Sequence, residues 1–134
     1  EFLQQEVVLS LQNKKDDLSR PMWRIVYQPS MTCDALCMEQ LYGLNQTHSA
    51  LGKLQKRVKA NVLTAQEMDL TGFSHIEPEQ AIHGELSSSY LYIVDPFGKA
   101  ILRYNGSLDR QQTIKTSKYM LSDLKKLLKY ARVG

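Results

Sequence analysis

The hydrophobic positions of the chain predict strands in four places. Met22–Tyr27 is rich in aromatic and β-branched residues, which favour a pleated sheet. Segment 57–63 alternates in part and predicts a second strand. Tyr90–Val94 is continuously apolar, as in a strand covered on both faces. The turn sequence Asp95–Gly98 follows, so Lys99–Tyr104 is expected to return as the second strand of a hairpin.

Two other segments place apolar residues at helical spacing. The first predicts a helix that Thr32 or Asp34 can cap at its start and Gly52 can end. The second predicts a helix at the end of the chain. Its basic residues form a solvated face and gather near the helix C-terminus, where the helix dipole favours positive charge. The first apolar stripe is Cys37, Leu41, Leu44, His48 and Leu51; the second is Met120, Leu121, Leu124, Leu127, Leu128 and Ala131; the basic face is Lys125, Lys126, Lys129 and Arg132.

Two stretches lack a clear period. Residues 1–20 are predicted to be an irregular N-terminal arm, which leaves residues 21–134 as one domain. Within residues 64–89, Pro78 suits a first helical position and predicts a short helix through about His83. A loop is expected after it.

The order strand, helix, strand, uncertain segment, hairpin, helix indicates an α/β fold. A strand–helix–strand unit followed by an antiparallel hairpin and a closing helix gives a mixed central sheet with helices on both faces. This is the layout of a thioredoxin-like fold.

Composition narrows the function classes. The chain has 134 residues, 43% hydrophobic and 23% charged, which excludes disordered and collagen-like classes. Its net charge of +3 is too small to indicate a nucleic-acid binder. No apolar run reaches the roughly 20 residues that cross a bilayer. Because the chain begins Glu1-Phe2 without an initiator Met, we interpret it as an excised fragment.

Cys33 and Cys37 lie four residues apart where the first strand meets the first helix. A helix N-terminus favours thiolates, which are nucleophiles and soft metal ligands, although Asp34 opposes this effect. Residues four apart within a helix have Cβ atoms about 5–6 Å apart, but a disulfide needs ~3.8 Å. A bridge therefore requires Cys33 in the preceding loop. The pair can be a reducible disulfide, a two-sulfur metal clamp, or two buried small hydrophobic residues.

The remaining candidate ligands are weaker. His48 falls on the apolar stripe and is expected to be a packed or partly buried core residue, while His75 and His83 are expected to be solvated loop residues. Met31 and Met38 flank the cysteines and could add soft sulfur, but filling gaps is the commoner use of methionine.

The chain resembles the Sco/SenC family. The resemblance rests on a strand ending in Tyr27, on Cys33-x-x-x-Cys37 opening a helix, and on a late apolar strand running into Asp95-Pro96-x-Gly98. These are thioredoxin-fold, membrane-tethered copper proteins that help assemble the binuclear copper centre of cytochrome c oxidase. The likeness is closer to small proteobacterial membrane proteins encoded among oxidase-assembly genes, and it spans roughly residues 22–134. Shared motifs include Leu51-Gly52-Lys53, Arg57-Val58, Leu91-Tyr92-x-Val94 and Asp123-Leu124-Lys125.

The resemblance implies an upstream inner-membrane anchor, a periplasmic domain, and copper held by Cys33 and Cys37 with His83 as a third ligand. It also implies a cytochrome c oxidase subunit or other assembly factors as partners. One departure concerns the third ligand. In the Sco pattern a histidine lies about nine residues before the proline of the turn, where this chain has Ser87, and His83 lies further upstream.

Three functions follow from these observations. The first is an assembly factor whose cysteines bind copper or keep a partner's copper-site cysteines reduced. The second is a redox-inert thioredoxin-like docking module. The third is a thiol–disulfide oxidoreductase in which Cys33 attacks and Cys37 resolves. The absence of a proline just before Tyr90, where thioredoxin-class oxidoreductases carry a cis-proline, weakens the third. Whether the protein is an enzyme stays open.

Overall fold

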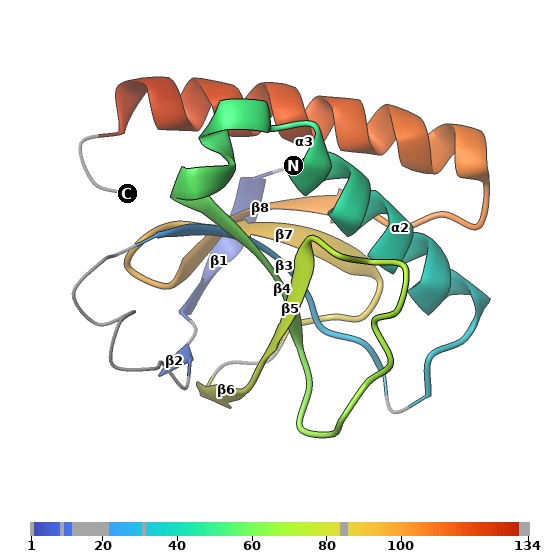
Figure 1. Ribbon diagram of the computed structural model, residues 1–134. Coiled ribbons are helices and arrows are strands. Elements are labelled where there is room, and N and C mark those ends of the chain that lie inside the picture. Colours follow the sequence, from blue (N-terminus) through green and yellow to red (C-terminus); the bar gives the residue numbers. More distant parts are fainter. Residues whose placement is uncertain (1, 9, 12–21, 31, 84–85, 132–134) are drawn as a thin grey trace.

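A six-stranded mixed sheet forms the centre of the molecule (Figure 1). In this computed structural model the described backbone covers residues 2–8, 10–11, 22–30, 32–83 and 86–131, and side chains are described for 22–30, 32–80 and 86–131. The strand order is β1-β8-β7-β3-β4-β5. The strands are β1 (Phe2–Val8), β3 (Trp23–Tyr27), β4 (Val58–Leu63), β5 (Ile76–Glu79), β7 (Tyr90–Val94) and β8 (Lys99–Asn105), and a separate small sheet pairs β2 (Ser10–Leu11) with β6 (Ala81–His83).

The strand directions confirm the mixed, thioredoxin-like sheet. β3, β4 and β5 run parallel, while β7 pairs antiparallel with β3 and with β8. Helix α2 (Ala35–Ser49) and the 3-10 helix η1 (Gly52–Arg57) make the crossover from β3 to β4. Helix α3 (Arg110–Tyr130) closes the described chain. All four predicted strands and both predicted helices are therefore present.

The two long helices lie on the same face of the sheet, where they pack against each other (Figure 1). Their buried residues join one core with the facing strand residues, and Leu41, Leu44 and Leu124 are at most 1% exposed. The sequence led us to expect helices on both faces. Among the described helices this is not so, and a smaller cluster occupies the opposite face of the sheet. Its members are Val26, Leu63, Leu86, Tyr92, Val94 and Ala100.

Two expectations about local structure are wrong. The short helix from Pro78 to His83 is replaced by strands β5 and β6. Ile76 pairs with Ala60 and is buried, so β5 gains sheet hydrogen bonds and core contacts that a helix there would lack. Proline is tolerated because β5 is an edge strand. The N-terminal arm is not irregular throughout, since Phe2–Val8 pairs with β8.

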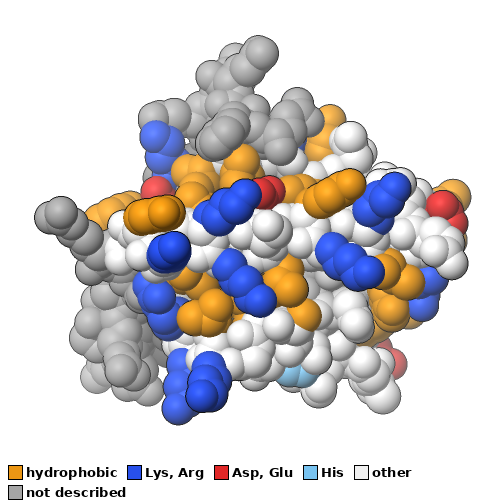
Figure 2. All heavy atoms as spheres, turned by 90° about the horizontal axis from the view of Figure 1, so that it is seen from above, with side chains coloured by type: hydrophobic (Ala, Val, Ile, Leu, Met, Phe, Trp, Pro, Cys, Tyr) orange, Lys and Arg blue, Asp and Glu red, His pale blue; other side chains and the backbone are white. Residues whose placement is uncertain are grey.

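The outward face of α3 is basic, as expected. Lys125, Lys126 and Lys129 are exposed, and Arg132 lies outside the described residues. Figure 2 shows lysine and arginine side chains spread over this face with hydrophobic side chains between them. Among the described residues, no helix combines the length and apolarity that a bilayer span requires.

Candidate functional site

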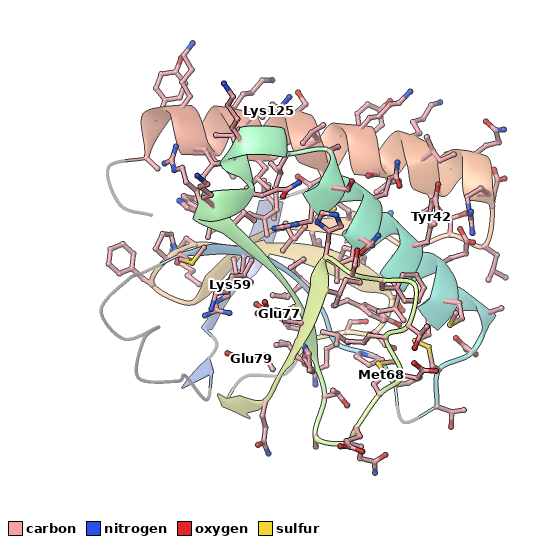
Figure 3. All side chains as sticks on the ribbon, in the orientation of Figure 1. Tyr42, Lys59, Met68, Glu77, Glu79 and Lys125 are labelled. Carbon is pink, nitrogen blue, oxygen red and sulfur yellow. A yellow bond between two sulfur atoms is a disulfide. The ribbon has the colours of Figure 1, made fainter. Side chains whose placement is uncertain are left out.

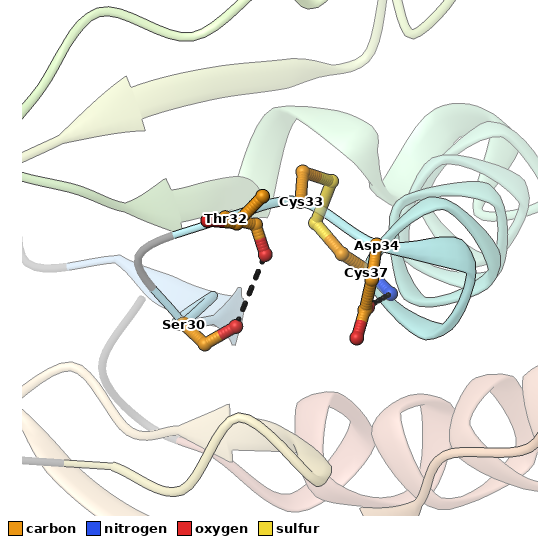
Figure 4. Close-up of a disulfide and its surroundings, with 5 residues drawn as sticks. All are labelled: Ser30, Thr32, Cys33, Asp34 and Cys37. Atoms are coloured by element: carbon orange, nitrogen blue, oxygen red, sulfur yellow. Dashed lines mark hydrogen bonds between the residues drawn. A yellow bond between two sulfur atoms is a disulfide. The ribbon is translucent and has the colours of Figure 1, made fainter.

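Cys33 and Cys37 form a disulfide at the junction of β3 and α2 (Figure 4). Cys33 lies in the loop before the helix and Cys37 in its first turn, and their Cα atoms are 5.0 Å apart. The expectation that a bridge needs Cys33 off the helix is confirmed. The parallel pairing of β3 with β4 fixes where β3 ends and therefore where this loop begins.

Asp34, between the two cysteines, is the N-cap of α2. Its Oδ1 accepts a hydrogen bond from the backbone N–H of Cys37 at 2.9 Å, which satisfies one of the free donors of the first turn. Thr32 was the other expected cap. Its carbonyl oxygen instead accepts a hydrogen bond from Ser30 Oγ, 3.1 Å away. Asp34 thus holds the backbone of Cys37 in place beside the disulfide.

Replacing Asp34 by alanine is expected to lower the free energy of unfolding by about 1 kcal/mol, because the Cys37 N–H loses its side-chain acceptor. Urea unfolding of the disulfide form measures the loss. The matched variant Asp109→Ala removes the cap of α3, where Asp109 Oδ1 accepts from Gln111 N at 3.3 Å, and should cost no more than Asp34→Ala. An Asp34→Ala protein as stable as the wild type would contradict this account of the cap.

The two sulfur-bearing residues differ sharply in burial. Cys33 is exposed, whereas Cys37 is 1% exposed and belongs to the main core. Beside the pair, Met38 keeps 49% of its surface exposed and does not belong to the core cluster, so it does not fill a gap in that core. A reagent or partner that approaches the disulfide therefore reaches Cys33 first.

Tyr27 ends β3 and is buried close to the site. Its side chain is 1% exposed, and burial, with the charge of Asp34 as a second cause, raises the pKa of Tyr27 to about 12. A phenol whose pKa is raised in the folded state stabilises the fold below the unfolded pKa near 10, and that stability is lost as the pH rises through 12.

We expect the stability difference between wild type and Tyr27→Phe to be constant up to about pH 10 and to shift against the wild type between pH 10 and 12. Phenylalanine has no proton to lose, so only the wild type carries this contribution. Urea unfolding of both proteins across this pH range measures the effect. A difference that does not change with pH would show that Tyr27 titrates as it does in the unfolded chain.

The segment before β7 contacts the loop that carries Cys33. The backbone N–H of Leu86 donates to Gln28 Oε1 at 3.0 Å, and the N–H of Ser87 donates to the hydroxyl of Tyr92 at 3.1 Å. Ser87, where the Sco pattern has a histidine, is thus held by the sheet close to Gln28. The sequence analysis did not predict the bond between Leu86 and Gln28, because these residues are 58 positions apart.

The other predicted ligands are placed only in part. The backbone of His83 lies in β6 opposite Ser10, but its side chain, like the whole of Met31, lies outside the described residues. Across the described side chains, no three histidine, cysteine or acidic residues converge as a metal-binding group would. His83 as a third copper ligand stays a prediction.

His48 and His75 form a pair that the sequence did not predict. Their Nδ1 atoms are 2.9 Å apart, and His48 Nε2 lies 2.7 Å from the carbonyl oxygen of Val58. Both side chains are half-buried. His48 is partly buried, as expected, whereas His75 is half-buried and not the solvated residue that was expected. No signal in the sequence links two histidines 27 residues apart.

The donor atoms of the site fit copper in one oxidation state better than the other. Two sulfurs that can become thiolates when the disulfide is reduced suit Cu(I), whereas Cu(II) would require added nitrogen. The described residues supply no such nitrogen beside the pair. The arrangement can therefore exchange two electrons as a disulfide and dithiol, and as a dithiol it can hold a soft ion.

Comparison with known proteins places this geometry in a family. A family model described as a transmembrane-like, thioredoxin-like, C-terminal domain matches residues 23–131. A search of curated proteins gives no match. Among solved structures, ScoI of Bradyrhizobium japonicum, with copper bound, superposes with a TM-score of 0.57 at 16% identity and covers 91% of this chain and 97% of its own. ScoI of Arabidopsis thaliana, also with copper bound, gives a TM-score of 0.57 at 11% identity over 91% of this chain and 98% of its own.

At these identities the two ScoI structures show a shared fold, and they confirm the Sco-like, thioredoxin-like architecture expected from the sequence. The family match covers the sheet from β3 onward, the disulfide and the whole of α3. The chain belongs to the family of transmembrane-like, thioredoxin-like C-terminal domains.

Proposed function

We propose that the protein is a membrane-anchored, periplasmic assembly factor that acts in the maturation of the copper site of cytochrome c oxidase through Cys33 and Cys37. The observation that carries the proposal is a disulfide between one exposed and one buried cysteine at a helix start. The similarity to ScoI structures that hold copper supports it. The partner would be an oxidase subunit or another assembly factor.

The proposed cycle has two states of the cysteine pair. In the disulfide state both sulfurs are bonded to each other, and neither is a thiolate ligand. An external dithiol reductant, itself oxidised to a disulfide, supplies the two electrons and two protons that convert the 33–37 disulfide into two thiols, whose thiolates are ligands for Cu(I). Exposed Cys33 would meet incoming copper, and Cys37 in the helix would complete a two-sulfur clamp. His83 is proposed as an additional ligand.

The difference in burial also favours a second candidate, reduction of a partner's disulfide. Here the Cys33 thiolate would attack one sulfur of the partner and release the other as a thiolate. Cys37 would then attack Cys33, which forms the 33–37 disulfide and frees the second partner thiol. The partner gains the two electrons that this chain loses, so each further cycle needs an external thiol reductant.

The test of the copper role is a Cu(I) titration of the reduced domain without oxygen, in competition with a chromogenic Cu(I) chelator. We expect one Cu(I) per chain. The disulfide form and a Cys33→Ser/Cys37→Ser variant should bind at least about 100-fold more weakly, because a pair of thiolates is removed. His83→Ala should cause a smaller loss. Equal binding by the reduced wild type and the double-serine variant would overturn the copper role.

Oxidase assembly in cells separates the remaining candidates. Full-length protein carrying both serine substitutions should fail to support assembly if the cysteines act by copper binding or by thiol reduction. Unimpaired assembly would instead favour the redox-inert docking module. If assembly fails although the purified domain does not bind Cu(I), the thiol-reducing role is favoured.

A further inference from the structure

A pocket of about 220 Å³ lies at the edge of the sheet, well away from the disulfide. Its lining includes His48, His75, Met22, Val58, Lys59 and Glu77. Figure 3 labels Lys59 on β4 and Glu77 on β5 at this edge. His48 follows Cys37 by eleven residues along α2, which corresponds to about 16 Å at the helical rise.

The hydrogen bonds fix which nitrogen of His48 carries a proton. A carbonyl oxygen only accepts, so His48 Nε2 must donate to Val58 O, 2.7 Å away. In the neutral ring the Nδ1 of His48 therefore holds a lone pair, which faces His75 Nδ1 at 2.9 Å. Metal-binding histidines are oriented in this way, with one nitrogen on the metal and the other donating to a backbone carbonyl.

Burial lowers the pKa of His48 below its ordinary value, and the nearby His75 lowers it further. The charge of Glu77 and the hydrogen bond to Val58 act in the opposite direction. Lys59, which also lines the pocket, adds a positive charge that opposes cation binding. Glu77 partly offsets that charge.

The distance between the two nitrogens is close to that of a metal site. Two metal–nitrogen bonds of ~2.0–2.1 Å at a tetrahedral angle hold the nitrogens about 3.4 Å apart. The observed 2.9 Å would have to open by only about 0.5 Å, which a side-chain rotation of half-buried His75 supplies. On binding, the His75 proton moves from Nδ1 to Nε2, so the ring stays neutral.

We propose that His48 and His75 form a binding site for one first-row transition-metal dication of the Cu²⁺ or Zn²⁺ class, separate from the cysteine pair. Imidazole nitrogen suits both ions. The thioether of Met22, in the pocket wall, can provide an additional donor, with water completing the coordination, and the negative charge of Glu77 favours a cation in the pocket. The described residues bring no third histidine, cysteine or acidic group into full convergence, so the site is built on two imidazoles.

The test uses the disulfide form of the protein, in which Cys33 and Cys37 cannot act as thiolate ligands. Calorimetric titration with Cu²⁺ and with Zn²⁺ should each give one site, with Cu²⁺ bound more tightly. Paramagnetic resonance of the Cu²⁺ complex should show coupling to two imidazole nitrogens. Because this form is inactive in Cu(I) capture, the result is independent of the proposed function.

The decisive variant is His75→Ala, which removes one ligand from a half-buried loop position and should weaken binding by at least about 100-fold. Glu67→Gln, which removes an exposed carboxylate outside this pocket, is the control and should bind as the wild type does. Glu77→Gln should weaken binding a few-fold. Unchanged affinity in His75→Ala, or a resonance spectrum without two imidazole nitrogens in the wild type, would overturn the site even if one variant folds poorly.

Discussion

Replacing Leu124 by alanine is expected to lower the free energy of unfolding by about 3–5 kcal/mol. Leu124 is 0% exposed and lies on α3 in the core that joins both helices to the sheet. Truncation removes buried apolar surface and leaves a cavity, because α2, α3 and the sheet are each held by many other contacts and collapse only in part. A loss of this size is a large fraction of the stability of a domain this small.

Urea unfolding of the disulfide form measures the change in a transition that should remain cooperative. Leu108→Ala serves as the control, because Leu108 is 67% exposed just before the cap of α3, and its loss should be within about 0.5 kcal/mol. Similar losses for both variants would mean that α3 does not share a core with α2 and the sheet.

The second large effect concerns the reactivity of the two cysteines taken one at a time. In Cys37→Ser the exposed Cys33 remains as a free thiol, and in Cys33→Ser the buried Cys37 remains. We expect Cys33 to react with a water-soluble thiol reagent at least about 100-fold faster. A buried thiol reacts only in molecules that open locally, and 100-fold corresponds to an opening free energy of about 2.7 kcal/mol.

Both single-cysteine proteins should react at similar rates in denaturant, which controls for the chemistry of the neighbouring residues. Stopped-flow absorbance of the released chromophore gives the rates. Faster reaction of Cys37 in the folded state would reverse the roles given to the two sulfurs, with Cys37 as the attacking group.

The sequence was sufficient for the elements whose patterns are local. The β-branched and aromatic runs of β3 and β7 and the apolar stripes of α2 and α3 carry their own periodicity, so strands and helices appear where predicted. The position of Cys33 outside the helix follows from the reach of a disulfide, which needs no tertiary information. These two facts already defined the candidate site.

The errors involve edges of the sheet, where pairing with distant residues decides the structure. β5 has two exposed residues, one of them a proline, so its period is weak, and its strand form comes from pairing with β4. β1 likewise depends on β8, about ninety residues later in the chain. No local pattern encodes these partners.

The contacts around the site were missed for the same reason. Gln28 with Leu86, and His48 with His75, meet only because the sheet brings their segments together. The two histidines are therefore in contact in the folded chain, although the sequence places them in a helix and a loop. The role of His83 remains a prediction.

X-ray absorption at the copper edge tests the central claim most directly, with one equivalent of Cu(I) on the reduced domain carrying His75→Ala so that the histidine pair cannot contribute. The account predicts a copper shell with two sulfur ligands, which disappears in Cys33→Ser/Cys37→Ser. A shell of nitrogen and oxygen alone, the same with or without the cysteines, would contradict it.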